Sequence, residues 1–262
     1  MELFVLNLQL FFLVFFRIIA TLEVMPLFSS SAVPQVAKVG MALFMAMVIF
    51  PGVVERGYVV PDNFVHYALV LLGEVLIGLI LGFFLVVIYD IFQVAGQFFS
   101  LQMGFGASEV FDPLAQVEIP LIGQFLNLIA MLVFVVIGGF QKFFLAGIDA
   151  SFRSITAMDL ASSQGRLLAT FAGSLGQLFE SALTISFPIL GTLFLVSLSM
   201  GLMAKAAPQM NLLMMGFPLA IGVAFIIMLA IMPFLMEAFA AIIETSFKMI
   251  SRLILEIKGD QI

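Results

Sequence analysis

Several ionisable residues of this chain lie inside apolar runs, where a charge is costly and therefore informative, and we single out three of them. Arg17 interrupts the run 3–25, and Glu74 and Asp90 interrupt the run 64–103. A charge at the centre of a membrane costs about 2.5–3.5 kcal/mol on insertion scales. Such a residue reaches a membrane interface, pairs with another subunit or a water-filled lumen, or carries protons. The sequence leaves these three interpretations open.

Other side chains that do chemistry are scarce. The chain has no cysteine and one histidine, His66, which excludes disulfides, zinc fingers, iron–sulfur clusters and multi-histidine metal sites. The patterns of serine hydrolases, zinc proteases and P-loop enzymes do not occur. We therefore predict that the chain is not an enzyme and that it holds no cofactor and no metal ion.

The elements that position these charges are predicted to be membrane helices. Of 262 residues, 63% are hydrophobic and 10% are charged, whereas soluble domains have about 25% charged residues. At about 20 residues per span, this length allows six or so helices. The net charge of −6 provides no basic patch for nucleic acid. We predict an all-α membrane protein that contacts membrane lipid and is made of helical hairpins and broken hydrophobic helices.

The apolar runs predict where the helices lie, at residues 3–25, 39–54, 64–103, 119–141, 181–204 and 211–236. Pro51-Gly52 is expected to end the second run, and Pro188, Pro218 and Pro233 are expected inside helices. Forty residues of helix measure about 60 Å, twice the hydrocarbon thickness. Run 64–103 must therefore break or project from the bilayer, and we favour a span at 65–89 that continues as a shielded polar helix.

Local patterns add further predictions. The last two runs predict a helical hairpin that turns at 206–209, and segment 149–166 predicts a polar connection. Residues 237–258 have the 3–4 spacing of an amphipathic helix, with Glu244/Lys248 and Arg252/Glu256 as i,i+4 ion pairs. We expect this C-terminal helix on the cytoplasmic side, and we expect the first apolar run to be retained rather than cleaved as a signal peptide.

Small and flexible residues also form patterns. Gly78 and Gly82 form a G-x-x-x-G motif, which we expect to bring two helices close together. Residues 104–118 are the clearest loop, since they combine glycines with three acids and no base. Methionines crowd the hairpin turn, where they are either adaptable core residues or a deformable seal.

Three blocks of residues resemble the R-subunit family of the flagellar export gate, the FliR family, and its type III secretion equivalents. The blocks are Gly73-Glu74 with Ile77-Gly78 and Leu81-Gly82-Phe83; Gly96 with Leu101-Gln102-Met103-Gly104 and Phe111-Asp112-Pro113; and Ala207-Pro208-Gln209 with Gly216-Phe217-Pro218-Leu219. The resemblance covers essentially the whole chain, and the middle block favours the flagellar branch.

The resemblance implies a structural and gating subunit of a protein-export channel in the bacterial inner membrane, within the flagellar basal body. Residues 1–180 would correspond to a P-type subunit and residues 181–262 to a Q-type hairpin with the amphipathic helix. The implied partners are the P and Q subunits (FliP and FliQ), the export switch protein FlhB and exported unfolded polypeptides. Export energy would come from elsewhere in the machine.

The resemblance also implies roles for individual residues. The pore plug would consist of Met103, Gly104, Phe105, Gly106, Phe111, Asp112 and Pro113. Candidate gate methionines are Met210, Met214 and Met215, and candidate inter-subunit charges are Arg17, Glu74, Asp90 and Lys205. The alternative to a gate subunit is a proton-coupled secondary transporter that uses Glu74 and Asp90.

Overall fold

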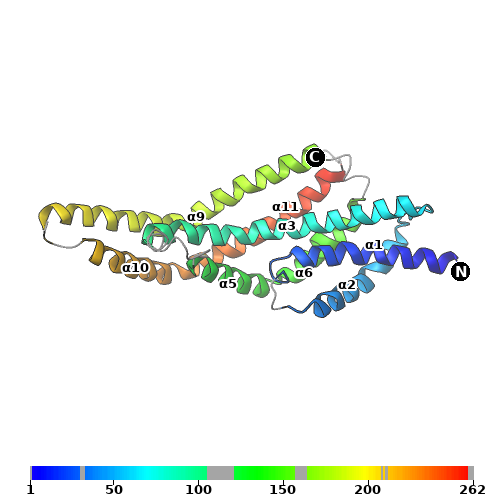
Figure 1. Cartoon of the computed structure of the whole chain (residues 1–262), viewed down its shortest axis with the longest axis horizontal. Coiled ribbons are helices and arrows are strands. Elements are labelled where there is room, and N and C mark those ends of the chain that lie inside the picture. Colours follow the sequence, from blue (N-terminus) through cyan, green and yellow to red (C-terminus); the bar gives the residue numbers. More distant parts are fainter. Residues whose placement is uncertain are drawn as a thin grey trace. The chain divides into compact units, whose positions relative to one another are not determined.

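The computed structural model describes residues 2–29, 33–104, 121–156, 164–207, 209 and 212–258 of the chain (Figure 1). Every regular element among these residues is helical, which confirms the predicted all-α class. The helices are α1 Glu2–Val24, α2 Gln35–Glu55, α3 Phe64–Met103, α5 Leu121–Val136, α6 Gly139–Phe143, the π-helix η1 Phe144–Asp149, α7 Ala150–Ser154, α9 Gln164–Ala206, α10 Leu212–Ala230 and α11 Met232–Lys258.

Among the described residues, four helices are long and apolar enough to cross a membrane. The number rises to six if each of two bent helix pairs forms one span. Both values agree with the all-α membrane architecture that the composition predicts.

Helix α3 is longer than a single membrane span requires. It runs from Phe64 to Met103 without interruption (Figure 1). Forty helical residues measure about 60 Å, so α3 projects from a bilayer rather than breaking inside it. One continuous helix thus holds both Glu74 and Asp90.

Several helix boundaries differ from the sequence prediction. Helix α2 passes Pro51 and ends at Glu55, because a proline removes one donor but does not stop later residues from donating. Helix α9 begins at Gln164 instead of residue 181, and the predicted connection 149–166 contains α7 as well as the first residues of α9. Charged residues at this connection were mistaken for a loop signal.

The last helices also divide at another place than predicted. The chain bends at Ile231, between α10 and α11, and not at residue 236. Pro233 therefore lies in the first turn of α11, where its missing N–H would have no intrahelical partner. Pro188 and Pro218 do lie inside helices, in α9 and α10, as predicted.

The amphipathic character of the C-terminal helix is confirmed. Its predicted apolar face is buried at Phe239, Ile243, Phe247, Ile250 and Ile254. The predicted Glu244/Lys248 pair is replaced by an ion pair between Glu244 and Lys142, whose Nζ lies 2.9 Å from Oε1. A lysine from another segment reaches the carboxylate, and spacing within one helix cannot reveal such a contact.

Hydroxyl groups in α9 are satisfied by the helix itself. Thr170, Ser174, Thr184, Thr192 and Ser199 each donate a hydrogen bond to the carbonyl oxygen four residues earlier. Such bonds let hydroxyl side chains remain in an apolar helix without another partner. The presence of these hydroxyl groups is therefore no evidence that α9 faces other proteins.

The chain forms two compact units, each assembled from segments far apart in sequence. Unit 1 consists of Met1–Ile88, Gly138–Leu175 and Glu244–Ile262, and unit 2 consists of Tyr89–Ile137 and Gly176–Ile243. The predicted division at residue 180 follows family resemblance rather than compactness, and it stays a prediction.

Unit 2 is held by a close crossing of α3 and α5. A Cβ atom added to Gly96 would lie 2.4 Å from Cα of Gly123, so only glycine allows this approach. Beside the crossing, the rings of Phe92 and Phe239 pack with their centroids 4.4 Å apart. This packing fixes the C-terminal half of α3, at the end of which the predicted loop begins.

Candidate functional site

Helices α1 and α3 pack backbone to backbone in unit 1. A Cβ atom on Gly78 would lie 2.2 Å from the carbonyl oxygen of Arg17, and one on Gly82 would lie 2.8 Å from that of Thr21. The G-x-x-x-G motif is therefore the packing surface that the sequence predicted. This approach brings the residues of α1 and α3 near Gly78 within side-chain reach of one another.

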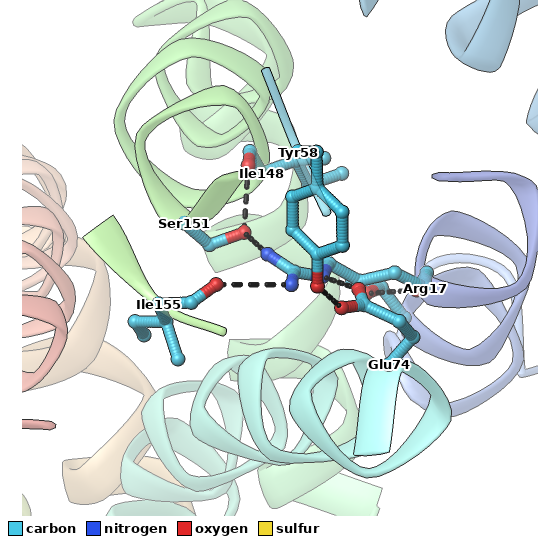
Figure 2. A network of polar contacts seen from close by, with 7 residues as sticks. Arg17, Tyr58, Glu74, Ile148, Ser151 and Ile155 are labelled. Carbon is cyan, nitrogen blue, oxygen red and sulfur yellow. Dashed lines mark hydrogen bonds and ion pairs between the residues drawn. The ribbon is translucent and has the colours of Figure 1, made fainter. Parts of the chain in front are cut away.

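A fully buried ion pair lies at this contact. Arg17 Nε donates to Glu74 Oε2 over 2.5 Å, and neither side chain is exposed to solvent. The other carboxylate oxygen, Glu74 Oε1, accepts a hydrogen bond from the Tyr58 hydroxyl (Figure 2). Both oxygens of the buried carboxylate thus have donors, as burial of a charge requires.

The rest of the Arg17 guanidinium contacts a third segment. Nη1 donates to Ser151 Oγ over 3.0 Å, and Nη2 donates to the carbonyl oxygen of Ile155 over 3.2 Å (Figure 2). The ring of Phe152 lies 3.9 Å from the guanidinium carbon, in cation–π geometry. We call Arg17, Tyr58, Glu74, Ser151, Phe152 and Ile155 the Arg17 network.

The local structure around Ser151 explains how this third segment reaches the guanidinium. The π-helix η1 ends at Asp149, α7 follows it, and the backbone is extended at Ile155. The Ser151 hydroxyl donates to the carbonyl oxygen of Ile148 over 2.7 Å, which leaves its oxygen free to accept from Arg17. The carbonyl of Ile155 is available because α7 has ended there.

The geometry makes the Arg17 network a structural element. Its buried groups satisfy one another's charges and hydrogen bonds. The Arg17 side chain does not extend to water or lipid, because it is fully buried. Its partner Glu74 is in the same chain, so the inter-subunit role predicted for this pair is not needed to neutralise either charge. Use of Glu74 as a proton carrier gains no support, since both of its oxygens are engaged.

The other two predicted charges lie elsewhere. Asp90 is half-buried on α3, in unit 2, and Lys205 is exposed in the last turn of α9. Neither has an ion-pair partner within the part of the chain that the structure describes. They remain candidates for contacts with other subunits.

Two of the predicted plug residues can be placed. Met103 is buried at the end of α3, and Gly104 follows it with a φ of 92°. Phe105, Gly106, Phe111, Asp112 and Pro113 lie outside the described residues. The structure therefore describes only the first two residues of the predicted plug.

Two of the three predicted gate methionines, Met214 and Met215, belong to the start of α10. Met215 is 58% exposed on α10. Met214 belongs to the same helix, and Met210 lies outside the described residues. An exposed methionine near the hairpin turn fits either interpretation that the sequence left open, an adaptable packing residue or a deformable seal.

Sequence reasoning missed four members of the Arg17 network: Tyr58, Ser151, Phe152 and Ile155. They lie 41 to 138 positions from Arg17, outside any helical spacing. One signal was present, since a charge buried without an acid at i±3 or i±4 needs a distant partner. Among the described residues, no group of three or more His, Asp or Glu could hold a metal ion.

Known proteins are similar in sequence to this chain over most of its length. The family described as "Bacterial export proteins, family 1" matches residues 8–246. The flagellar biosynthetic protein FliR of Bacillus subtilis is 35% identical over 224 residues, 85% of each chain. That of Borreliella burgdorferi is 32% identical over 234 residues, 88% of this chain and 85% of the relative.

A relative with another name also matches. The surface presentation of antigens protein SpaR of Shigella sonnei is 27% identical over 199 residues, 76% of this chain. The family match covers α2, α3 and α9 entirely, together with every member of the Arg17 network. The chain therefore belongs to the FliR family of bacterial export proteins and is a membrane component of the flagellar export apparatus.

Proposed function

We propose that the chain is a structural and gating subunit of the flagellar type III protein-export channel. It forms the pore together with the P and Q subunits, FliP and FliQ, and it contacts the switch protein FlhB. The channel lies in the bacterial inner membrane, within the basal body, and unfolded polypeptides pass through it. Membership of the FliR family supports this proposal.

The observation that carries the proposal is the length of the apolar surface along α9. Large hydrophobic side chains are exposed over almost the whole helix, among them Leu168, Phe179, Phe187, Phe194 and Leu202. Leu168 and Leu202 are 34 residues apart, roughly 51 Å along the helix.

A bilayer alone cannot cover this surface. Its hydrocarbon core is about 30 Å thick, which is less than the roughly 51 Å of helix between Leu168 and Leu202. We infer that part of the apolar surface of α9 lies outside lipid. Other polypeptides must cover that part, which is what a multi-subunit channel provides. A transporter surrounded by lipid on all sides offers no such cover.

The assembly experiment is expression of the chain with and without the P and Q subunits. With them, native mass spectrometry is expected to show one hetero-oligomeric complex. Alone, the chain is expected to aggregate in detergent, because the apolar surface of α9 stays uncovered. A monodisperse monomer whose helices are protected from hydrogen exchange would contradict the proposal.

We further propose that loop 103–118 is a plug that closes the pore sterically. Deleting Phe105–Ala107 is expected to leave the complex assembled and to make cells permeable to ions and small solutes, because the bulk of the loop is reduced. Patch-clamp conductance of the complex in a planar bilayer measures the effect. The Phe64→Ala variant, which truncates an exposed ring at the start of α3, is the control and should conduct as wild type. Unchanged conductance of an assembled deletion variant would refute the plug.

Asp90 and Lys205 are proposed to face other subunits of the channel. Asp90 is half-buried in an apolar helix, and Lys205 lies exposed beside the hairpin turn. An unpaired charge at such positions becomes less costly when a neighbouring chain supplies the opposite charge. The paired Arg17 and Glu74 are not needed for these contacts.

A further inference from the structure

The end of α3 is shaped by one aromatic ring of another helix. Within unit 2, Gly104 follows the last residue of α3 with a φ of 92°, a conformation that side chains rarely adopt. Its N–H donates to the carbonyl oxygen of Leu101 over 3.1 Å. A Cβ atom at this position would lie 2.2 Å from both Cδ1 and Cε1 of the Phe217 ring. The ring therefore occupies the space that a side chain of residue 104 would need.

Phe217 is not an ordinary core residue. Its side chain is 38% exposed, whereas that of Met103, the residue before Gly104, is only 1% exposed. Its ring lies on bare glycine backbone at the point where α3 ends. A large apolar ring in such a place restricts how the backbone of Gly104 can move.

The helix that carries Phe217 is in turn packed against α9. A Cβ atom on Gly216 would lie 3.2 Å from the sulfur of Met200 in α9. Pro218, directly after Phe217, has no N–H and limits the conformation of the residue before it. A continuous set of contacts thus connects α9, α10 and the end of α3.

We propose that Phe217 is a positioning residue that fixes the conformation of Gly104 and thereby sets how the following loop leaves α3. The inference rests on the proposed plug, because it assigns the α9–α10 hairpin control over the base of that loop. Movement of the hairpin would shift the ring, release Gly104 and change the position of the loop. Regulation of the pore would then start at the hairpin and not in the loop.

The test compares Phe217→Ala with Phe225→Ala in the assembled complex. Phe225 is a matched control, since it lies on the same helix and is 40% exposed. Phe217→Ala is expected to accelerate hydrogen exchange at the amide of Gly104 by about tenfold through local opening, and to raise ion conductance. Phe225→Ala should change neither quantity. Wild-type exchange at Gly104 in Phe217→Ala would overturn the inference.

A second variant tests the ring contact directly. Gly104→Ala is expected to raise conductance because its Cβ atom collides with the Phe217 ring. The same substitution should have a smaller effect in the Phe217→Ala background, where the collision is removed and only the strain of positive φ remains. Equal effects in both backgrounds would show that the ring does not hold residue 104.

The two proposals fail in different ways. If Phe217→Ala accelerates exchange at Gly104 but neither it nor deletion of Phe105–Ala107 changes conductance, the plug is wrong and the positioning role stands. If the deletion raises conductance while Phe217→Ala leaves both exchange and conductance unchanged, the plug stands and the positioning role is wrong.

Discussion

Replacing Glu74 by glutamine is expected to destabilise the packing of α1 on α3 by about 3–5 kcal/mol, since it leaves the charge of Arg17 buried without a counter-charge. Both side chains are fully buried in the native chain. Native-state hydrogen exchange of α1 and α3 amides, measured in the assembled complex, reports this loss as faster local opening.

A double variant separates the charge from the packing. Arg17→Met combined with Glu74→Leu removes both charges, and it should be less destabilised than Glu74→Gln alone, because no unpaired ion remains. The control is Lys142→Met, which breaks an ion pair whose side chains are 43% and 55% exposed. An exposed pair contributes little to stability, because water and salt screen it. A Glu74→Gln variant as stable as this control would show that the buried pair is unimportant.

Replacing Gly78 by alanine is expected to force α1 and α3 apart, at a cost of about 1–3 kcal/mol for overpacking a tight contact. The added Cβ atom would lie 2.2 Å from a backbone carbonyl oxygen, which cannot turn aside as the tip of a flexible side chain can. Because Arg17 supplies that carbonyl, the ion pair with Glu74 should lengthen as well. Heat stability of the complex and exchange protection of α1 measure the effect.

Gly40→Ala is the matched control. Gly40 also lies inside a helix of unit 1, α2, but a Cβ atom there would meet nothing within 4 Å. Alanine in a helix is favoured over glycine by about 0.5–1 kcal/mol, so this variant should be as stable as wild type or slightly more stable. A Gly78→Ala variant that behaves like Gly40→Ala would contradict the tight packing of α1 on α3.

The sequence predicted helix type more reliably than helix boundaries. The periodic face of α11 was recognised because burial repeats every three to four residues, and Phe239, Ile243 and Ile250 are indeed buried. The start of α9 was missed because charged residues near 164 looked like a connection. Composition distinguishes polar segments from apolar ones. A single helix can contain both kinds of segment, as α9 does.

The sequence indicated only part of the Arg17 network. Arg17 and Glu74 stood out because charges are rare in apolar runs, and the G-x-x-x-G motif marked the face on which α3 packs. Nothing along the chain joined these observations to one another. Tyr58 and Ser151 carried no signal, since a tyrosine or a serine in a polar segment is common.

The sequence by itself determined that this chain is helical, apolar and a member of the FliR family, because these properties depend on composition, periodicity and short blocks of residues. Only the tertiary structure decided that Arg17 finds its counter-charge in Glu74, and that the Phe217 ring rests on Gly104. Both contacts join residues 57 or more positions apart. The partner of a side chain across such a distance depends on which helices pack together and in what register, and a linear pattern does not contain that information.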